Sequence, residues 1–166
     1  DEYMLNVPES YDFDDKEVVL ETKTQFELEC LVNGEVMPIE EASDSMFAHK
    51  LMGDGIMIRP YDGVVVAPCD GIISMVYPTK HAIGITIDDN TQILIHFGTD
   101  SAKLNGKGFE LLVKPNQKVK AGDVLWNADL TYIKENALDE NIIVVFTKIK
   151  DGAELEKKYG KMQCHD

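Results

Sequence analysis

The stretch that most constrains this chain is a pair of short apolar runs around a polar turn, with a histidine near each outer end. Residues 82–87 (AIGITI) and 92–97 (QILIHF) are short and rich in β-branched side chains. The four residues between them, Asp-Asp-Asn-Thr, are typical of a tight turn. The sequence therefore predicts a β-hairpin.

This hairpin would bring His81 and His96 onto one face. With a two-residue loop at 89–90, Ile83 lies opposite His96, and His81 lies opposite Gly98. Because side chains alternate between the faces of a strand, the two histidines would be diagonal neighbours, roughly 7–8 Å apart at Cα. A register shift of one residue would separate them. Converging imidazoles can hold a metal, exchange protons, or carry a phosphoryl group on nitrogen.

The histidine face of this hairpin would otherwise be mostly apolar, with Ile83, Ile85, Ile87, Gln92 and Leu94 beside His96. Such a face is either half-buried core or the centre of a docking surface. The pattern alone leaves both readings open.

The remaining chain has the rhythm of a β protein. Asp-Gly pairs separate strand-like runs of about five to eight residues, as antiparallel sandwiches and barrels require. These pairs lie at 54–55, 62–63 and 70–71, and further strands are expected at 109–114, 124–128 and 142–149. Asn33-Gly34 is a further hairpin signal. The sequence predicts an all-β fold.

Only short helices are expected in this chain. They lie at 43–50, where Ser43 or Asp44 is the cap, at 129–137, where Asp129 is the cap, and at 152–160. Residues 1–17 are acidic and lack an apolar period, so we interpret them as a mobile leader or linker remnant. Residues 18–166 would then form a single domain.

Composition excludes several classes of function. Thirty acidic against sixteen basic residues give a net charge of −14, which argues against a nucleic-acid or anionic-membrane surface. No apolar run approaches the ~18 residues that span a bilayer, so we expect a cytoplasmic protein without direct membrane insertion. The three cysteines, Cys30, Cys69 and Cys164, are odd in number and far apart, which favours reduced thiols.

Two other functions fit parts of the sequence. A metal-binding or regulatory module could use His81 and His96 as zinc ligands with a partner's carboxylate, although two histidines fall short of the three or four ligands that zinc needs. A covalent cofactor carrier is the other alternative, since VVAPCDGIIS (65–74) and VKAGDVL (119–125) resemble biotinyl and lipoyl domains. Those domains carry a modifiable lysine at a hairpin tip, and this tip has none.

Five segments together resemble the glucose-type enzyme IIA domain of the bacterial phosphoenolpyruvate-dependent sugar phosphotransferase system. They are FAHKLMGDGIMIRP (47–60), VVAPCDGIIS (65–74), TKHAIGI (79–85), ILIHFGTDSAKLNGKGF (93–109) and KVKAGDVL (118–125). The combination of HFG, an upstream T-x-H and a downstream L-x-G-x-GF is specific to that family. The resemblance covers about residues 28–149.

The resemblance implies an antiparallel β-sandwich of the duplicated hybrid motif type, with few short helices, and a phosphotransferase role that requires no cofactor. In that family's pattern His96 accepts a phosphoryl group on Nε2 from the phosphocarrier HPr and passes it to a cysteine of a IIB domain for sugar uptake. His81 would hydrogen-bond the phosphate, and Thr79 would orient His81. The Gly98 carbonyl would fix the His96 tautomer, and Asp100 would be the acid beside the site.

The resemblance also implies an apolar surface for docking HPr, the IIB domain and possible regulatory targets. Its residues would be Met46, Phe47, Leu51, Met52, Tyr77 and Leu94. Three nearby positions depart from the usual pattern. Thr99 stands where an apolar residue is common, and Ala102 and Lys103 replace apolar and acidic residues. We expect the changes at Ala102 and Lys103 to alter partner affinity and to leave the phosphorylation site intact.

Overall fold

The structure is a computed structural model that describes residues 27–165. The expected leader, residues 1–17, and the boundary at residue 18 lie outside the described residues. Residues Leu28–Lys150 form one compact unit together with the segment that begins at Glu154. No helix in the described part of the chain is long and apolar enough to cross a membrane.

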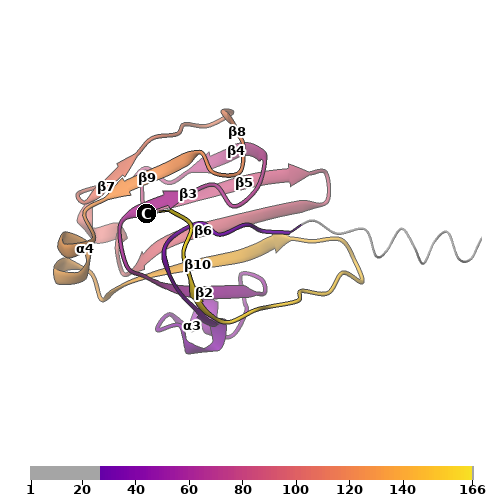
Figure 1. The fold of residues 1–166 in the computed structure, drawn as a ribbon, viewed down its shortest axis with the longest axis horizontal. Coiled ribbons are helices and arrows are strands. Elements are labelled where there is room, and N and C mark those ends of the chain that lie inside the picture. Colours follow the sequence, from indigo (N-terminus) through magenta and orange to yellow (C-terminus); the bar gives the residue numbers. More distant parts are fainter. Residues whose placement is uncertain (1–26, 166) are drawn as a thin grey trace, which may run out of the picture. The chain divides into compact units, whose positions relative to one another are not determined.

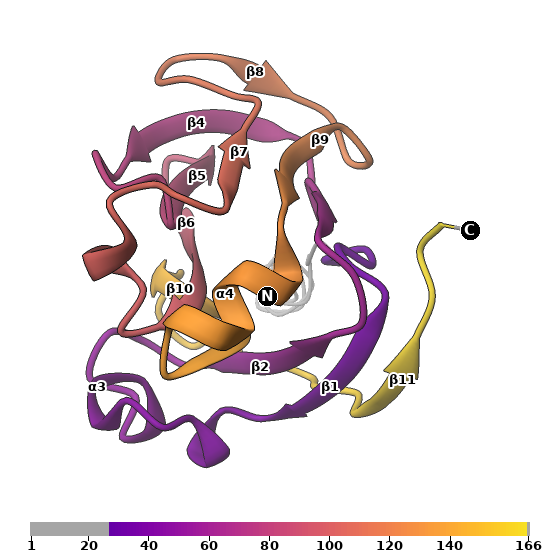
Figure 2. The ribbon, with the colours of Figure 1, turned by 90° about the vertical axis from the view of Figure 1, so that its left-hand side faces the viewer.

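Two antiparallel sheets make up this unit (Figure 1). In spatial order, the larger sheet contains β11 (Gly160–Met162), β1 (Gly34–Pro38), β2 (Gly55–Pro60), β10 (Asp139–Lys148), β6 (Thr91–Thr99), β5 (Ala82–Asp88), β4 (Gly71–Val76) and β8 (Lys118–Val119). The smaller sheet contains β3 (Val64–Val66), β9 (Val124–Ala128) and β7 (Phe109–Leu111). Figure 2 shows the larger sheet curling from β4 through β6 and β10 to β2. The predicted mostly-β antiparallel fold is confirmed.

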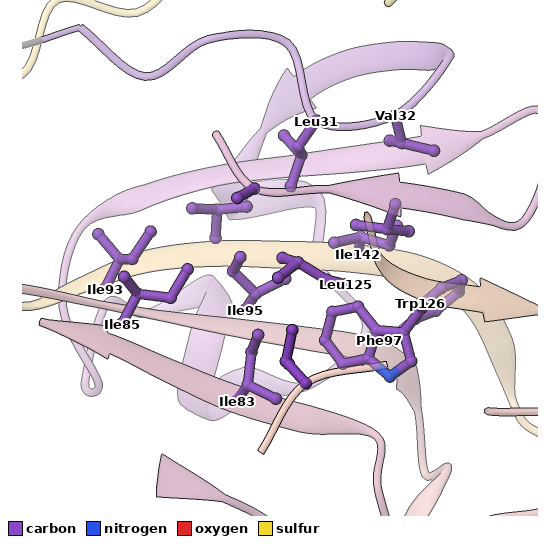
Figure 3. Close-up of a cluster of buried hydrophobic side chains, with 14 of the residues drawn as sticks. Leu31, Val32, Ile83, Ile85, Ile93, Ile95, Phe97, Leu125, Trp126 and Ile142 are labelled. Carbon is purple, nitrogen blue, oxygen red and sulfur yellow. The ribbon is translucent and has the colours of Figure 1, made fainter. Parts of the chain in front are cut away.

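The main core lies between the two sheets, because each contributes the inward-facing set of its alternating side chains. Figure 3 shows isoleucines of β5 and β6 packed against side chains of β9. The fully buried members include Ile83, Ile85, Ile93, Ile95, Phe97, Leu125, Trp126 and Ile142. Phe97 meets Trp126 edge to face, with ring centroids 5.7 Å apart.

Two of the three expected helices form, and both begin at the predicted caps. In α3 (Ser45–Ala48) the Asp44 carboxylate accepts a hydrogen bond from the Met46 N–H, and in α4 (Leu130–Asn136) the Asp129 carboxylate accepts one from the Tyr132 N–H. Two short 3₁₀ turns, η2 (Ile39–Glu41) and η3 (Ala102–Leu104), complete the helical content of residues 27–165.

The prediction of a helix at 152–160 is wrong. Residues 154–159 are irregular, and the chain then forms β11, which pairs with β1 (Figure 2). So short a helix is marginal unless tertiary packing supports it, whereas the edge of β1 offers backbone partners. The Asn33-Gly34 hairpin is also wrong, because β1 pairs with β2 and β11 and not with a segment that precedes it.

The cysteine prediction is corrected as well. Cys30 and Cys164 form a disulfide across 134 positions of sequence, with a Cα–Cα distance of 5.4 Å. Their meeting depends on β11 reaching the edge of β1, a pairing that cysteine spacing cannot predict. Asn33 reinforces it, because its side-chain oxygen accepts hydrogen bonds from the backbone N–H groups of Cys164 (2.6 Å) and His165 (3.2 Å). Cys69 is a buried free thiol.

Candidate functional site

The hairpin β5–β6 forms, but its register differs from the prediction. Asp88 lies opposite Thr91 as expected, and then a bulge between Thr86 and Asp88 shifts the pairing by one residue. Ala82 therefore faces His96, which the simple count had placed opposite Ile83. The bulge turns the isoleucines of β5 into the core, where β-branched side chains pack best.

The isoleucine and histidine faces of the hairpin are thus opposite faces. Ile83 and Ile85 pair with Ile95 and Ile93 in the core, while the side of His96 carries Ala82, Gly84 and Leu94. The predicted histidine face containing Ile83 and Ile85 is wrong for this reason.

His81 reaches His96 from a bend and not along a strand. It precedes β5, and Lys80 before it has a left-handed φ of 64°. The His81 carbonyl accepts a hydrogen bond from the Phe97 N–H (2.7 Å), which fixes the bend against β6. The two imidazole rings lie with centroids 4.8 Å apart at 82°. The structure thus brings both sequence-predicted histidines together, by a route that strand counting did not foresee.

Trp126 of β9 holds the same bend from the opposite sheet. Its indole Nε1–H donates to the Lys80 carbonyl (2.8 Å), and the side chain is fully buried. A left-handed conformation is costly for a lysine, so it persists only when the surroundings fix it. This contact was absent from the sequence reasoning, because β9 and the bend are distant in the chain.

Thr79 lies where the sequence predicted it, beside His81. Its Oγ1 is 2.8 Å from His81 Nδ1, within hydrogen-bonding distance. His81 is itself buried, with 3% of its surface exposed. The contact occupies Nδ1 and leaves Nε2 as the ring nitrogen available to another group.

The Nδ1 atom of His96 is buried and meets no hydrogen-bond partner among the described residues. The backbone of Gly98, which has a φ of 82°, raises the pKa of His96. It does not lie in hydrogen-bond geometry with Nδ1. The buried Ser101 hydroxyl donates to the Phe97 carbonyl (2.7 Å) and approaches the Gly98 carbonyl (3.3 Å). The role of Gly98 in fixing the tautomer stays a prediction.

Burial keeps both imidazoles neutral. Desolvation, followed by the proximity of His81, lowers the pKa of His96 to about 4, against opposing effects of Gly98, Asp44 and Asp139. Desolvation also lowers the pKa of His81, although the Thr79 backbone opposes it. A neutral imidazole has a free lone pair on one nitrogen, so the site presents a nucleophile at neutral pH.

The apolar residues expected around the histidines divide into two groups. Phe47 and Leu94 are buried, at 5% and 3% exposure, so the expectation of an exposed docking face is wrong for them. The Phe47 ring lies 5.0 Å from the His96 ring. Phe47 and Leu94 both belong to a second, smaller core cluster, with Ile39, Met57, Ala82, Ile143 and Val145. Met46 and Leu51 are exposed, at 46% and 67%.

Two more residues of the expected docking surface, Met52 and Tyr77, are half-buried against the same cluster. The Tyr77 ring meets the His81 ring edge to face, at 5.2 Å. Leu138, which the sequence reasoning missed, is 65% exposed, and its N–H donates to the Thr99 carbonyl (3.0 Å). An exposed leucine at an element boundary has no pattern that would have revealed it.

The acidic residues that act on His96 differ from the one that was predicted, Asp100. Asp100 forms an ion pair with Lys103 (3.2 Å) on an exposed turn. Asp44 and Asp139 raise the pKa of His96, so their charges act on the ring. Asp44 was predicted only as a helix cap, and Asp139 was not considered.

Residues 27–165 contain no group of three or more histidine, cysteine or acidic side chains arranged to hold a metal. His81 and His96 would supply two ligands, and zinc needs three or four. A zinc ion at this site would therefore require a ligand from a partner, and such a site stays a prediction.

Known proteins resemble this chain in sequence and in fold. The family model for the phosphoenolpyruvate-dependent sugar phosphotransferase system, EIIA 1, matches residues 26–152. The PTS system glucose-specific EIICBA component of Staphylococcus carnosus is 48% identical over 125 residues, which are 75% of this chain and 18% of that protein. The chain thus spans less than a fifth of that relative. The structure of glucose permease IIA from Mycoplasma capricolum matches with a TM-score of 0.80 at 32% identity, over 85% of this chain and 92% of that one.

Proposed function

This chain belongs to the EIIA 1 family of the phosphoenolpyruvate-dependent sugar phosphotransferase system, and we propose that it carries a phosphoryl group on His96. The group would come from phospho-HPr and pass to a cysteine of a IIB domain. The observation that carries the proposal is the pair of neutral imidazoles, His81 and His96, with centroids 4.8 Å apart. Such a pair supplies one nucleophile and one supporting donor.

The phosphoryl transfer can be described atom by atom at this site. Nε2 of neutral His96 attacks phosphorus, the bond to the histidine nitrogen of phospho-HPr breaks, and its electron pair returns to that imidazole. If the Thr79 hydroxyl donates to His81 Nδ1, the His81 proton lies on Nε2 and can be donated to the phosphoryl oxygens. Little further machinery is required, because positioning between two partners lowers most of the barrier.

We propose glucose as the transported sugar, because the names of both relatives refer to glucose. The Staphylococcus carnosus relative is named as an EIICBA component, which supports a IIB domain as the acceptor partner. Docking would use the exposed Met46 and Leu51 and the half-buried Met52 and Tyr77 around the histidines. HPr and IIB act on the cytoplasmic side in this family, so we assign the chain to the cytoplasm.

The test is incubation with phosphoenolpyruvate, enzyme I and HPr, followed by measurement of bound phosphate and of its acid lability. We expect one phosphate per chain in the wild type and none in His96→Ala. His81→Gln should still accept phosphate but transfer it poorly to IIB, because its amide can donate to phosphate without replacing an imidazole. His49→Ala, a change at an exposed histidine, is the matched control and should label normally. Normal labelling of His96→Ala would refute the assignment.

A further inference from the structure

Asp139 is hydrogen-bonded to three separate groups beside the site. It stands at the start of β10, opposite Thr99 at the end of β6. Its Oδ1 accepts from the Thr99 hydroxyl (2.7 Å) and the Asn141 N–H (3.0 Å). Its Oδ2 accepts from the Ser43 hydroxyl (3.0 Å). Both oxygens of one half-buried carboxylate are therefore in use.

Two of these partners belong to segments that adjoin His96. Thr99 directly follows Gly98, and a Cβ placed on Gly98 would lie 3.3 Å from the Asp139 carbonyl oxygen. Ser43 directly precedes Asp44, the cap of α3, and α3 places the Phe47 ring 5.0 Å from the His96 ring. One carboxylate thus ties the turn after the histidine to the helix that covers it.

The charge of Asp139 also affects the pKa of His96. Its hydrogen-bond partners are two hydroxyls and a backbone amide, none of which is a cation. The carboxylate raises the pKa of His96 against the larger effect of burial. A phosphoryl group on His96 would add close to two negative charges, so this carboxylate would favour onward transfer over retention.

We propose that Asp139 is a positioning residue of the site, which clamps α3 and the Gly98 turn against His96 through Ser43 and Thr99. The functional consequence rests on the proposed phosphotransfer, but the clamp itself does not. Thr99 takes part through its hydroxyl, which gives a physical role to the residue that departs from the family's usual apolar one.

The decisive comparison is between Asp139→Ala and Asp139→Asn. The alanine removes all three hydrogen bonds. The asparagine keeps the acceptor at Oδ1, and the Ser43 hydroxyl can reverse to accept from the new amide, so only the charge is lost. We expect phosphorylation of Asp139→Ala by phospho-HPr to be roughly tenfold slower per folded molecule, since small misplacements of reacting groups cost this much or more. Asp139→Asn should stay within about threefold of wild type.

Further variants keep the test informative if Asp139→Ala does not fold. Thr99→Val and Ser43→Ala each remove one arm of the clamp at little change of shape, and each should slow phosphorylation about threefold. Asp89→Asn removes an equal charge from the exposed hairpin tip and is the matched control, with an unchanged rate. Equal slowing in Asp139→Asn and Asp139→Ala would overturn the clamp, because charge alone would then explain the effect.

A second measurement separates this inference from the proposed function. Nuclear magnetic resonance of the unphosphorylated protein reports the His96 ring, whose proton shifts depend on the nearby Phe47 ring. Movement of these signals in Asp139→Ala, with little movement in Asp89→Asn, supports the clamp even if the wild type fails to accept phosphate. Unmoved signals and an unchanged rate, with only a lower melting temperature, would reduce Asp139 to a purely structural residue and overturn the proposal.

Discussion

The His96 ring is held neutral by burial. Its pKa of about 4 lies well below the ordinary value of 6.5, and desolvation is the largest cause. An exposed imidazole would be about half protonated at pH 6.5 and would lose its nucleophilic lone pair as the medium acidifies. The desolvated ring of the half-buried His96 avoids that loss over the whole physiological range.

The same shift makes folding stability depend on pH. The folded-state pKa lies below the unfolded value, so the unfolded chain binds more protons as the pH falls from 6.5 towards 4. Acidification from pH 7 to 4.5 should therefore cost about 2–3 kcal/mol through His96 alone. Denaturant titrations of wild type and His96→Gln should show this, with a shallower pH dependence in the variant. Parallel curves for the two proteins would mean that the ring titrates normally.

Trp126 gives a second prediction, about the bend that carries His81. Trp126→Phe keeps an aromatic ring against Phe97 but removes the hydrogen bond to the Lys80 carbonyl. We expect displaced His81 ring signals and slower phosphotransfer. Lys80→Gly should partly restore both in the double variant, because glycine adopts the left-handed conformation without strain. A double variant no better than Trp126→Phe would show that the indole acts only through packing.

Local sequence revealed some of these residues and concealed others. His81, His96 and Thr79 lie within 18 positions of one another in a recognisable pattern, so the motif located them. Asp139 bonds to Ser43 across 96 positions and to Thr99 across 40, and nothing local marks these partnerships. The Lys80–Trp126 contact, across 46 positions, was hidden for the same reason.

At the scale of elements, alternation and capping predicted most of the longer strands and both of the helices α3 and α4, because these signals are carried within each segment. The bulge in β5 was not predictable in this way. One unpaired residue in a strand changes which side chains share a face of the sheet. Whether the bulge forms depends on the packing of Ile83 and Ile85 in the core, which lies outside the hairpin's own sequence. The late strand β11 was missed because its partner, β1, lies at the other end of the domain.

The helix α3 provides a prediction at this scale. Phe47 is 5% exposed, and it packs in the second core cluster beneath the site. Phe47→Ala should lower the free energy of unfolding by about 3–5 kcal/mol, as truncation of a buried phenylalanine does. Met46→Ala, at the exposed neighbouring position, should change stability by less than about 0.5 kcal/mol. Urea denaturation of both variants makes the comparison, and a small loss in Phe47→Ala would mean that the ring lies on an accessible docking face after all.

At the scale of the whole molecule, the segment after Glu154 fastens the edge of the larger sheet. It lies beyond the stretch that the family model matches, residues 26–152. Lys157 forms an ion pair with Asp54 (2.6 Å), β11 extends the sheet beside β1, and Cys164 is bonded to Cys30. Covering the edge of β1 protects backbone groups that could otherwise pair with another chain.

The disulfide between Cys30 and Cys164 gives the last prediction. It closes a loop of 134 residues, and the chain-entropy relation assigns such a loop a stabilisation of up to about 5 kcal/mol. Reduction should therefore lower the melting temperature by roughly 10–20 °C for a domain of this size. Labelling of His96 should be unaffected, since β1, β2 and β10 separate β11 from β6 in the sheet. The matched control is a Cys30→Ser, Cys164→Ser double variant. Its melting temperature should equal that of the reduced wild type and should not change when reductant is added. If oxidised and reduced wild type melt together, the hydrogen bonds of β11 and Asn33 hold the segment without help, and the bond contributes no stability.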